Sequence, residues 1–260
     1  MSTQDEKAAA FRALHDGEPF VIPNPWDVGS ARVFEALGFK ALATTSSGFA
    51  FTLGRLDGSV TLEEIVEHTR ALDRATGLPV SVDLENGYGP TPEDAATAIT
   101  RAAEAGAVGG SIEDFDRGGE LYGFDHAVER VAAAVEAARG LAFPFTLTAR
   151  AENHLHGRHD LDDTIARLQA YEAAGADVLY APRITTTEEM RAVCEAVTKP
   201  VNVLAVRDLT FAQIAEAGAQ RVSVGGTLTW TAVTAFIEAA TAIRDRGDFS
   251  LLGAGRDWFA

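Results

Sequence analysis

The feature that most limits the fold of this chain is an alternation of short apolar runs and longer amphipathic segments. The apolar runs occupy residues 20–24, 41–46, 79–84, 109–114, 145–150, 177–182, 201–206 and 221–226. The segments between and after them occupy residues 30–37, 61–75, 92–105, 125–138, 160–174, 187–197, 208–217 and 228–243. Their apolar side chains recur at three- and four-residue spacing, as helices packed on one face require. Near-continuous apolar strands separated by helices are typical of a parallel sheet covered by helices.

The number of strand–helix units predicts the architecture. Eight units allow closure into a (β/α)8 TIM barrel, whose active site lies at the carboxyl ends of the strands. An open, doubly wound sheet is the alternative. No linker or break in composition divides the chain, so we expect residues 1–260 to form a single domain. Residues 1–18 are expected to form an extra N-terminal helix.

Composition excludes several classes of protein. Hydrophobic residues make up 47% of the chain, enough for a sizeable core and too many for a disordered protein. The formal net charge of −16 argues against nucleic acid or an anionic membrane as the main partner. The first residues lack the pattern of a secretion signal, and no apolar run is long enough to span a bilayer. We therefore expect a cytoplasmic protein.

Polar residues follow the apolar runs at six of the predicted strand ends. They lie within residues 24–27, 44–48, 83–89, 113–116, 149–154 and 181–183. Burial of a charged group costs on the order of several kcal/mol unless the group is paired or binds a metal. Since the carboxyl ends of the strands meet at one mouth of a barrel, the repetition of this pattern predicts a functional site there.

Four carboxylates from neighbouring strand ends are expected to converge at this mouth. They belong to Asp83, Glu85, Glu113 and Asp114. A set of carboxylates without a Cys/His cage favours a hard divalent cation such as Mg²⁺, with Mn²⁺ possible. The alternative is helix capping by acids near a helix start, which explains Asp94 better than Asp83 because Asp83 still belongs to the apolar run.

One cation and three hydroxyl residues complete the predicted site. Arg150 ends an apolar run, where it is expected to hold a carboxylate or phosphoryl group or to stabilise an enolate oxygen. Its alternative role is that of an ion-pair partner for Glu113 or Glu152. Hydroxyl and backbone N–H groups of Thr45, Ser46 and Ser47 suit an anion, or simply cap a loop. Residues 153–160 carry three histidines, which suggest a zinc site or, as we prefer, a solvated lid loop.

Taken in order, these segments resemble the isocitrate lyase / phosphoenolpyruvate mutase superfamily. SVDLENGYG, at residues 81–89, is similar to the family's Asp-x-Asp-x-Gly-Tyr-Gly metal motif, with Glu85 in place of the second Asp. GGSIEDF (109–115), TARAEN (148–153) and DTIARLQAYEAAGADVLYAP (163–182) resemble the segments that follow it. TTSSGFAFTLGRLDG (44–58) resembles the substrate loop, including its end at Asp57. The resemblance spans residues from about 24 to about 181.

The resemblance implies a site and a chemistry. It implies Mg²⁺ held directly by Asp83, with Asp57, Glu85 and Glu113 acting largely through water. It implies that Thr45 and Ser46 contact the substrate's carboxylate or oxo oxygen and that Arg150 lies over the bound anion. We also expect Ser47, Asp83 and Asn202 to contact the substrate, and we expect catalytic roles for Arg150 and Glu113, with the proton moved by Tyr88, Tyr122 or Glu152. The family makes or breaks a C–C or P–C bond beside a 2-oxo acid or its enolate. It also implies a homo-oligomer, a dimer or tetramer, that exchanges its last barrel helix, with the apolar tail at residues 249–260 assisting.

One loop departs from the family pattern. Isocitrate and methylisocitrate lyases carry Lys-Lys-Cys-Gly-His after the fourth strand, whereas this chain has EDFDRGGELYGFDH at residues 113–126. A standard isocitrate lyase is therefore not expected, and the Lys, Asn and Thr/Ser residues of the mutase loop are also missing. We expect a Mg²⁺-dependent lyase or hydrolase of a small 2-oxo or 2-hydroxy carboxylate, of the oxaloacetate or substituted malate type. The alternatives are a phosphonopyruvate-type mutase or hydrolase, and a 2-oxo acid binding protein without catalysis.

Overall fold

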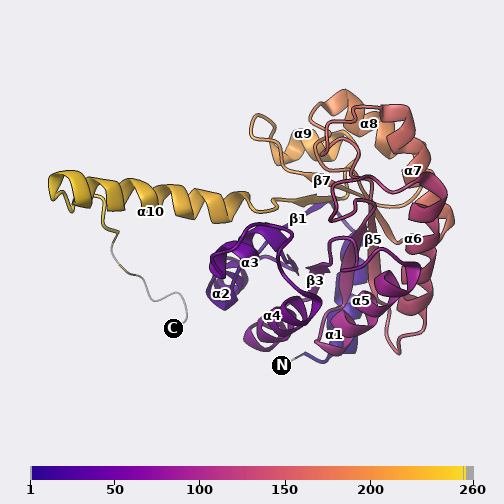
Figure 1. Ribbon diagram of the computed structural model, residues 1–260, viewed down its shortest axis with the longest axis horizontal. Coiled ribbons are helices and arrows are strands. Elements are labelled where there is room, and N and C mark those ends of the chain that lie inside the picture. Colours follow the sequence, from indigo (N-terminus) through magenta and orange to yellow (C-terminus); the bar gives the residue numbers. More distant parts are fainter. Residues whose placement is uncertain (1, 254, 256–260) are drawn as a thin grey trace.

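The computed structural model describes residues 2–253 and 255 and shows strands and helices in alternation (Figure 1). The strands are β1 (Phe20–Ile22), β2 (Leu42–Ala43), β3 (Val80–Asp83), β4 (Gly109–Glu113), β5 (Thr146–Arg150), β6 (Val178–Tyr180), β7 (Val201–Leu204) and β8 (Arg221–Ser223). The helices are α1 (Gln4–His15), α2 (Val28–Ala36), α3 (Ser46–Thr52), α4 (Leu62–Ala75), α5 (Pro92–Glu104), α6 (Phe124–Arg139), α7 (Leu161–Ala173), α8 (Thr187–Ala196), α9 (Phe211–Glu216) and α10 (Thr227–Arg246). That residues 1–260 form one domain stays a prediction.

The strands form one parallel sheet that closes into a barrel. Their order is β1-β8-β7-β6-β5-β4-β3-β2, and each neighbouring pair is parallel. Two hydrogen bonds join its ends: the Ala43 amide donates to the Pro23 carbonyl at 3.1 Å, and Asn24 Nδ2 donates to the Thr44 carbonyl at 3.0 Å. This topology confirms the predicted (β/α)8 barrel and excludes the doubly wound sheet.

Many of the helices begin at a threonine that caps them. In α1, α4, α5, α8 and α9 the threonine side chain accepts from an amide three residues on, and the side chain there returns a bond to the threonine amide. Such capping boxes satisfy amides that a helix start leaves without partners. These capping residues set where each helix begins. For α4, α5, α8 and α9 they therefore also set where the preceding loop at the mouth of the barrel ends.

The two faces of the strands differ in polarity. Outward-facing residues such as Leu147, Leu179 and Val222 pack against the surrounding helices in two large apolar clusters. The register of the sheet aligns Glu113 with Arg150, Arg150 with Tyr180, Tyr180 with Asn202, and Asn202 with Arg221. Because aligned residues of parallel strands point to the same face, this row of polar side chains lines the inside of the barrel. The barrel interior is therefore largely polar.

The predicted extra N-terminal helix is confirmed as α1, which packs against the amino ends of the strands. Phe11 is fully buried in a third apolar cluster with Ile22 and Val108. Gln220 Nε2, next to β8, donates to the carbonyls of Leu14 at 3.1 Å and Gly17 at 2.9 Å. Helix α1 thus closes the end of the barrel opposite the mouth.

Helix α10 projects away from the barrel (Figure 1, yellow). Within the described residues its buried positions are Thr229 and Ala242, whereas Phe236 is 68% exposed. The predicted exchange of this helix between subunits is not tested by a single chain and stays a prediction. Residues 254 and 256–260 of the predicted apolar tail lie outside the described residues. No described helix is both long and apolar enough to cross a membrane.

Candidate active site

A cavity of about 260 Å³ opens at the carboxyl ends of the strands and reaches into the barrel. Its lining includes Asn24, Thr44, Thr45, Ser46, Ser47, Asp57, Asp83, Ser111, Thr148, Arg150, Leu155, Tyr180, Asn202, Arg221 and Ser223. A larger cavity of about 530 Å³ lies among the amino ends of the strands, around Thr146 and Val178. We assign the site to the smaller cavity because the polar strand ends converge there, as in other (β/α)8 barrels.

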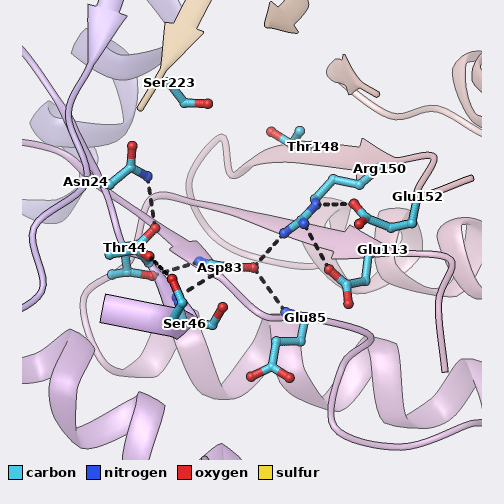
Figure 2. A network of polar contacts seen from close by, with 12 residues as sticks. Asn24, Thr44, Ser46, Asp83, Glu85, Glu113, Thr148, Arg150, Glu152 and Ser223 are labelled. Atoms are coloured by element: carbon cyan, nitrogen blue, oxygen red, sulfur yellow. Dashed lines mark hydrogen bonds and ion pairs between the residues drawn. The ribbon is translucent and has the colours of Figure 1, made fainter. Parts of the chain in front are cut away.

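Arg150 is the centre of the charged part of the site (Figure 2). Each of its guanidinium nitrogens contacts a different carboxylate: Nη1 lies 2.8 Å from Asp83 Oδ1, Nη2 3.0 Å from Glu113 Oε2, and Nε 2.8 Å from Glu152 Oε1. The Arg150 side chain is 13% exposed, and Glu152 is 1% exposed. The ion-pair role that the sequence offered for Arg150 is therefore observed with both Glu113 and Glu152, and its role toward a substrate anion or enolate stays a prediction.

Burial and charge act against each other in this cluster. Burial disfavours the charged form of Arg150, but Glu152, Glu113 and Asp83 outweigh it and raise the pKa of Arg150 above its usual value. Burial raises the pKa of Glu113 and of Glu152 despite the opposing effect of Arg150. One guanidinium thus keeps its charge while it faces more negative charge than it can neutralise.

Asp83, the last residue of β3, is held by backbone and hydroxyl groups. Its Oδ2 accepts from the Ser46 amide at 3.3 Å, where α3 begins, and its Oδ1 accepts from the Glu85 amide at 3.3 Å. Its own amide donates to Thr44 Oγ1 at 2.8 Å. Thr45 caps α3 through the Gly48 amide, so the substrate-loop residues and the metal-motif residues form one connected unit. The orientation of both Asp83 carboxylate oxygens is therefore fixed by these hydrogen bonds.

The turn after β3 explains the sequence that follows Asp83. Glu85, Gly87 and Tyr88 all adopt positive φ angles, of 47°, 81° and 65°. A side chain at Gly87 would place a Cβ 2.8 Å from Ala95 Cα, so the position requires glycine on both conformational and steric grounds. This left-handed turn bends the chain back beneath the mouth and brings the Glu85 side chain under the cavity.

Glu85 carries an incompletely satisfied carboxylate. Its Oε2 lies 2.9 Å from Arg117 Nη2, whereas its buried Oε1 has no hydrogen-bond partner among the described residues. Burial and the nearby Asp83 raise the pKa of Glu85 to about 7, although Arg117 lowers it. At the exposed rim of the cavity, burial and the same Asp83 also raise the pKa of Asp57. Asp57, Asp83 and Glu85 therefore repel one another.

These carboxylates suit a hard divalent cation. In the part of the chain that the structure describes, the arginines that face these acids are Arg117 and Arg150, and His156 Nε2 lies 3.9 Å from Glu152 Oε2. The acids, Asp57, Asp83, Glu85, Glu113 and Glu152, therefore outnumber the arginines. An orphaned buried oxygen on Glu85 and mutual repulsion at Asp57 are relieved by a cation with oxygen ligands. Among the described residues no three carboxylate or histidine side chains stand close enough to chelate an ion together. The carboxylate oxygens present are nevertheless the ligand type that Mg²⁺ prefers.

Tyr88 and Asp114 are not brought into the cavity. Arg117 Cζ lies 4.4 Å from the centroid of the Tyr88 ring. The two side chains line a separate depression that also contains Asp94. Asp114 faces outward because it follows the inward-facing Glu113 in the strand direction. Its Oδ2 accepts from Arg167 Nη1 at 3.0 Å and from the Tyr171 hydroxyl at 2.5 Å. Asp114 is therefore part of a buried structural network, and the converging set contains Glu152 in its place.

The two loops beside the mouth are folded back on themselves. Residues 115–121 form a short hairpin, closed by a bridge between Phe115 and Leu121. His156 stacks on Phe115, with ring centroids 3.2 Å apart, so the hairpin contacts the histidine-rich loop. Residues 155–160 are exposed, as expected of a solvated loop, whereas His154 is 3% exposed. The Arg158 amide donates to the Asn153 carbonyl at 2.8 Å and closes this loop.

Sequence reasoning assigned no individual role to three residues in and around the cavity. Asn24 Oδ1 accepts from the amides of Val224 and Gly225, both at 2.9 Å, and so ties β1 to the loop after β8. Arg117 lies in the loop at residues 113–126, which lacks the lysine and cysteine of isocitrate lyases, and it supplies the cation beside Glu85. Arg221 begins β8, and the alternation of Arg221, Val222 and Ser223 was the available signal that its side chain points into the barrel.

Comparison with known proteins agrees with this fold and site. The family model described as phosphoenolpyruvate phosphomutase matches residues 11–244, and the chain belongs to this family. The sequence is 53% identical to that of a protein from Burkholderia cenocepacia J2315 whose crystal structure is known. The two structures superpose with a TM-score of 0.94 over 98% of this chain and 95% of that chain. A 2,3-dimethylmalate lyase, of the PEP mutase/isocitrate lyase superfamily, is 26% identical with a TM-score of 0.85, over 96% of this chain and 90% of that chain. An oxaloacetate decarboxylase from Bradyrhizobium diazoefficiens is 30% identical over 74% of this chain and 71% of its own length.

These relatives define a class of enzymes. The superfamily contains lyases and hydrolases that act on oxaloacetate, methylisocitrate and phosphonopyruvate. The sequence resemblance is thereby confirmed at the level of the superfamily.

Proposed function

We propose that this protein is a Mg²⁺-dependent enzyme that cleaves a C–C bond in a small 2-oxo or 2-hydroxy carboxylate of the oxaloacetate or substituted malate type. The observation that carries the proposal is the excess of carboxylates around Asp83 and Arg150 at the mouth of the barrel. Similarity to an oxaloacetate decarboxylase and to a 2,3-dimethylmalate lyase supports this substrate class.

In this proposal the residues around Asp83 hold the cation. Asp83 would bind Mg²⁺ directly, and Asp57, Glu85 and Glu113 would bind it through water; Mn²⁺ has the same ligand preferences. When bound, the cation supplies a Lewis acid that polarises the oxo group of the substrate. Thr45, Ser46 and Ser47 line the cavity at the start of α3, where their hydroxyl and N–H groups would orient the substrate carboxylate.

Arg150 and its partners would stabilise the enolate that bond cleavage produces. The guanidinium is fixed by three ion pairs, and each Nη carries a second N–H that can donate to a substrate oxygen in the cavity. Such a donor, already oriented before the reaction, stabilises charge that develops in the transition state. Glu113 and Glu152 hold the Arg150 guanidinium in place and do not line the cavity, so they would act through Arg150, and water would supply the proton to the enolate carbon. Tyr88 also lies outside the cavity lining, and its catalytic role stays a prediction.

The experiment is a turnover assay with a panel of 2-oxo and 2-hydroxy acids, monitored by proton NMR with Mg²⁺ and then with EDTA. We expect Mg²⁺-dependent loss of at least one oxo acid, reduced about 100-fold or more in Asp83→Ala. Asp94→Ala is the matched control, because Asp94 is an exposed acid that caps α5. Metal-independent turnover, or full activity in Asp83→Ala, contradicts the proposal.

The same samples test the alternatives. Consumption of phosphonopyruvate in phosphorus NMR, without turnover of oxo acids, would instead establish P–C bond chemistry. Tight Mg²⁺-dependent binding of an oxo acid without turnover of any substrate would instead indicate a binding protein.

The oligomeric state belongs to the same proposal. Helix α10 presents Trp230, Phe236 and Ile237 to solvent in the single chain, although exposed apolar patches are usually covered. We propose that α10 packs on the barrel of a second copy, in a dimer or tetramer. A cytoplasmic location stays a prediction of the sequence.

A further inference from the structure

Arg221 is a second guanidinium in the cavity, and its hydrogen-bond partners are neutral. Its side chain is buried, at 5% exposure, and it lines the inner part of the cavity. Nε donates to Asn202 Oδ1 at 2.8 Å, Nη2 donates to Thr148 Oγ1 at 3.0 Å, and Nη1 lies 3.2 Å from His15 Nε2. Among the described residues no carboxylate forms an ion pair with it, in contrast to Arg150.

His15 does not compensate the charge of Arg221. Its Nδ1 lies 2.9 Å from the Phe11 carbonyl, which fixes the proton on Nδ1 and leaves Nε2 as the acceptor for Arg221. Burial and the nearby Arg221 lower the pKa of His15 to about 3, so the ring is neutral. The guanidinium therefore keeps a positive charge that its surroundings solvate but do not neutralise.

The position of Arg221 relates it to the proposed cation site. Thr148, its hydrogen-bond partner, precedes Arg150 by two residues on β5 and points to the same side of the sheet. A strand rises about 3.3 Å per residue, so Thr148 lies roughly 7 Å before Arg150 along the tilted strand, and the Arg221 guanidinium contacts β5 closer to the floor of the barrel than Arg150 does. The cavity therefore has an acidic, cation-binding end at the mouth and a basic end at its floor.

Asn202 holds Arg221 in this position. Its Oδ1 accepts from Arg221, and its Nδ2 donates to Ser223 Oγ at 2.9 Å. Both ends of the amide are thus occupied by neighbouring side chains. These contacts make Asn202 a positioning residue for Arg221, and because it also lines the cavity its contact with the substrate stays a prediction.

We propose that Arg221 binds a second, distal carboxylate of the substrate, so that the cavity selects 2-oxo dicarboxylates over 2-oxo acids with an apolar tail. A buried guanidinium without an acidic partner is costly, and a carboxylate is the group whose geometry it matches best. Arg150 cannot take this role as well, because three carboxylates already surround it. The inference rests on the proposed function, since it assigns the other end of the same substrate.

The experiment compares 2-oxo acids of equal chain length by calorimetry with Mg²⁺ present. One pair is oxaloacetate and 2-oxobutanoate, and the other is 2-oxoglutarate and 2-oxopentanoate. Oxalate, which is too short to span both ends of the cavity, reports on the mouth alone. We expect one dicarboxylate to bind at least about tenfold more tightly than its apolar counterpart, as a hydrogen-bonded charge pair requires.

Two variants test whether Arg221 causes this preference. In Arg221→Gln we expect the preference to fall to about twofold or less, while the oxalate Kd stays within about threefold of wild type. Asn202→Asp keeps the guanidinium and gives it an internal counter-ion, so the same loss of preference is expected even if Arg221→Gln does not fold. Arg139→Gln, an exposed arginine at the far end of the barrel, is the control.

The outcomes separate the two proposals. If oxalate binds with Mg²⁺ but neither dicarboxylate is preferred, or if the preference survives in both variants, the role of Arg221 is refuted and the mouth site stands. If oxalate does not bind with Mg²⁺ at all, the proposed function fails, and the inference fails with it.

Discussion

Replacement of Arg150 by methionine tests whether one guanidinium holds the site together. Methionine keeps much of the apolar stem and removes the charge that faces Asp83, Glu113 and Glu152. The side chains of these acids are 17%, 16% and 1% exposed, so water reaches the first two only in part and the third hardly at all. The variant therefore leaves three carboxylates close together without a counter-ion.

The expected cost follows from this geometry. Removal of one partner from a buried ion pair destabilises a protein by about 3–5 kcal/mol. Three partners do not triple the cost, because the acids respond by taking up protons, so we expect a loss of about 3–5 kcal/mol in the free energy of unfolding. Addition of Glu152→Gln to Arg150→Met neutralises the most buried acid and should restore about 1 kcal/mol or more.

The assay is urea unfolding followed by circular dichroism at pH 7 without divalent cations. Arg139→Met is the matched control: Arg139 lies 2.7 Å from Asp177, but the two side chains are 47% and 32% exposed, so its loss should cost about 1 kcal/mol or less. If Arg150→Met costs no more than Arg139→Met, or if Glu152→Gln lowers stability further in the Arg150→Met background, the cluster does not depend on Arg150 as described.

Two further predictions concern the ends of the chain. Burial lowers the pKa of His15 from 6.5 to about 3. As the pH falls below 6.5, His15 is therefore protonated in the unfolded state but not in the folded state, and the free energy of unfolding decreases. At pH 5 this amounts to about 2 kcal/mol, and His15→Gln, which keeps an acceptor for Arg221, should lose correspondingly less between pH 7 and pH 5 in urea titrations; equal losses would contradict the assignment. In α10, Phe236→Asp should reduce the molar mass measured by light scattering to that of a smaller species, whereas Phe236→Leu should not. An unchanged mass for Phe236→Asp would argue against packing through this face.

The mouth of the barrel was predictable because its residues interrupt a regular pattern. Asp83 and Arg150 are charges at the ends of apolar runs, and in a parallel barrel such ends meet regardless of the details of the loops. For the same reason Glu113 and Glu152 could be placed beside Arg150 before any coordinates existed. What the pattern encodes here is the direction of a strand and the position of its last residue.

The floor of the barrel and the orientation of turn residues were not predictable in this way. Tyr88 adopts a positive φ and its ring stacks against Arg117 outside the cavity lining, and the sequence around it does not specify that angle or that contact. Arg221 begins a strand instead of ending it, so it lies where barrels usually carry packing residues. Its partner His15 comes from α1, and no local signal relates these two distant positions.

The closure of the barrel by α1 has a consequence for how the chain folds. The bond between His15 and Arg221 spans 206 residues of sequence, and so does the bond from Gln220 to the Leu14 carbonyl. Contacts between such distant segments slow folding, because the chain loses entropy before the contacts form. During synthesis α1 is the first element to emerge and β8 is the last strand, so the barrel closes over Phe11 and its apolar neighbours only when nearly the whole chain has been made. The apolar face of α1 therefore needs protection from aggregation while the rest of the chain is being made.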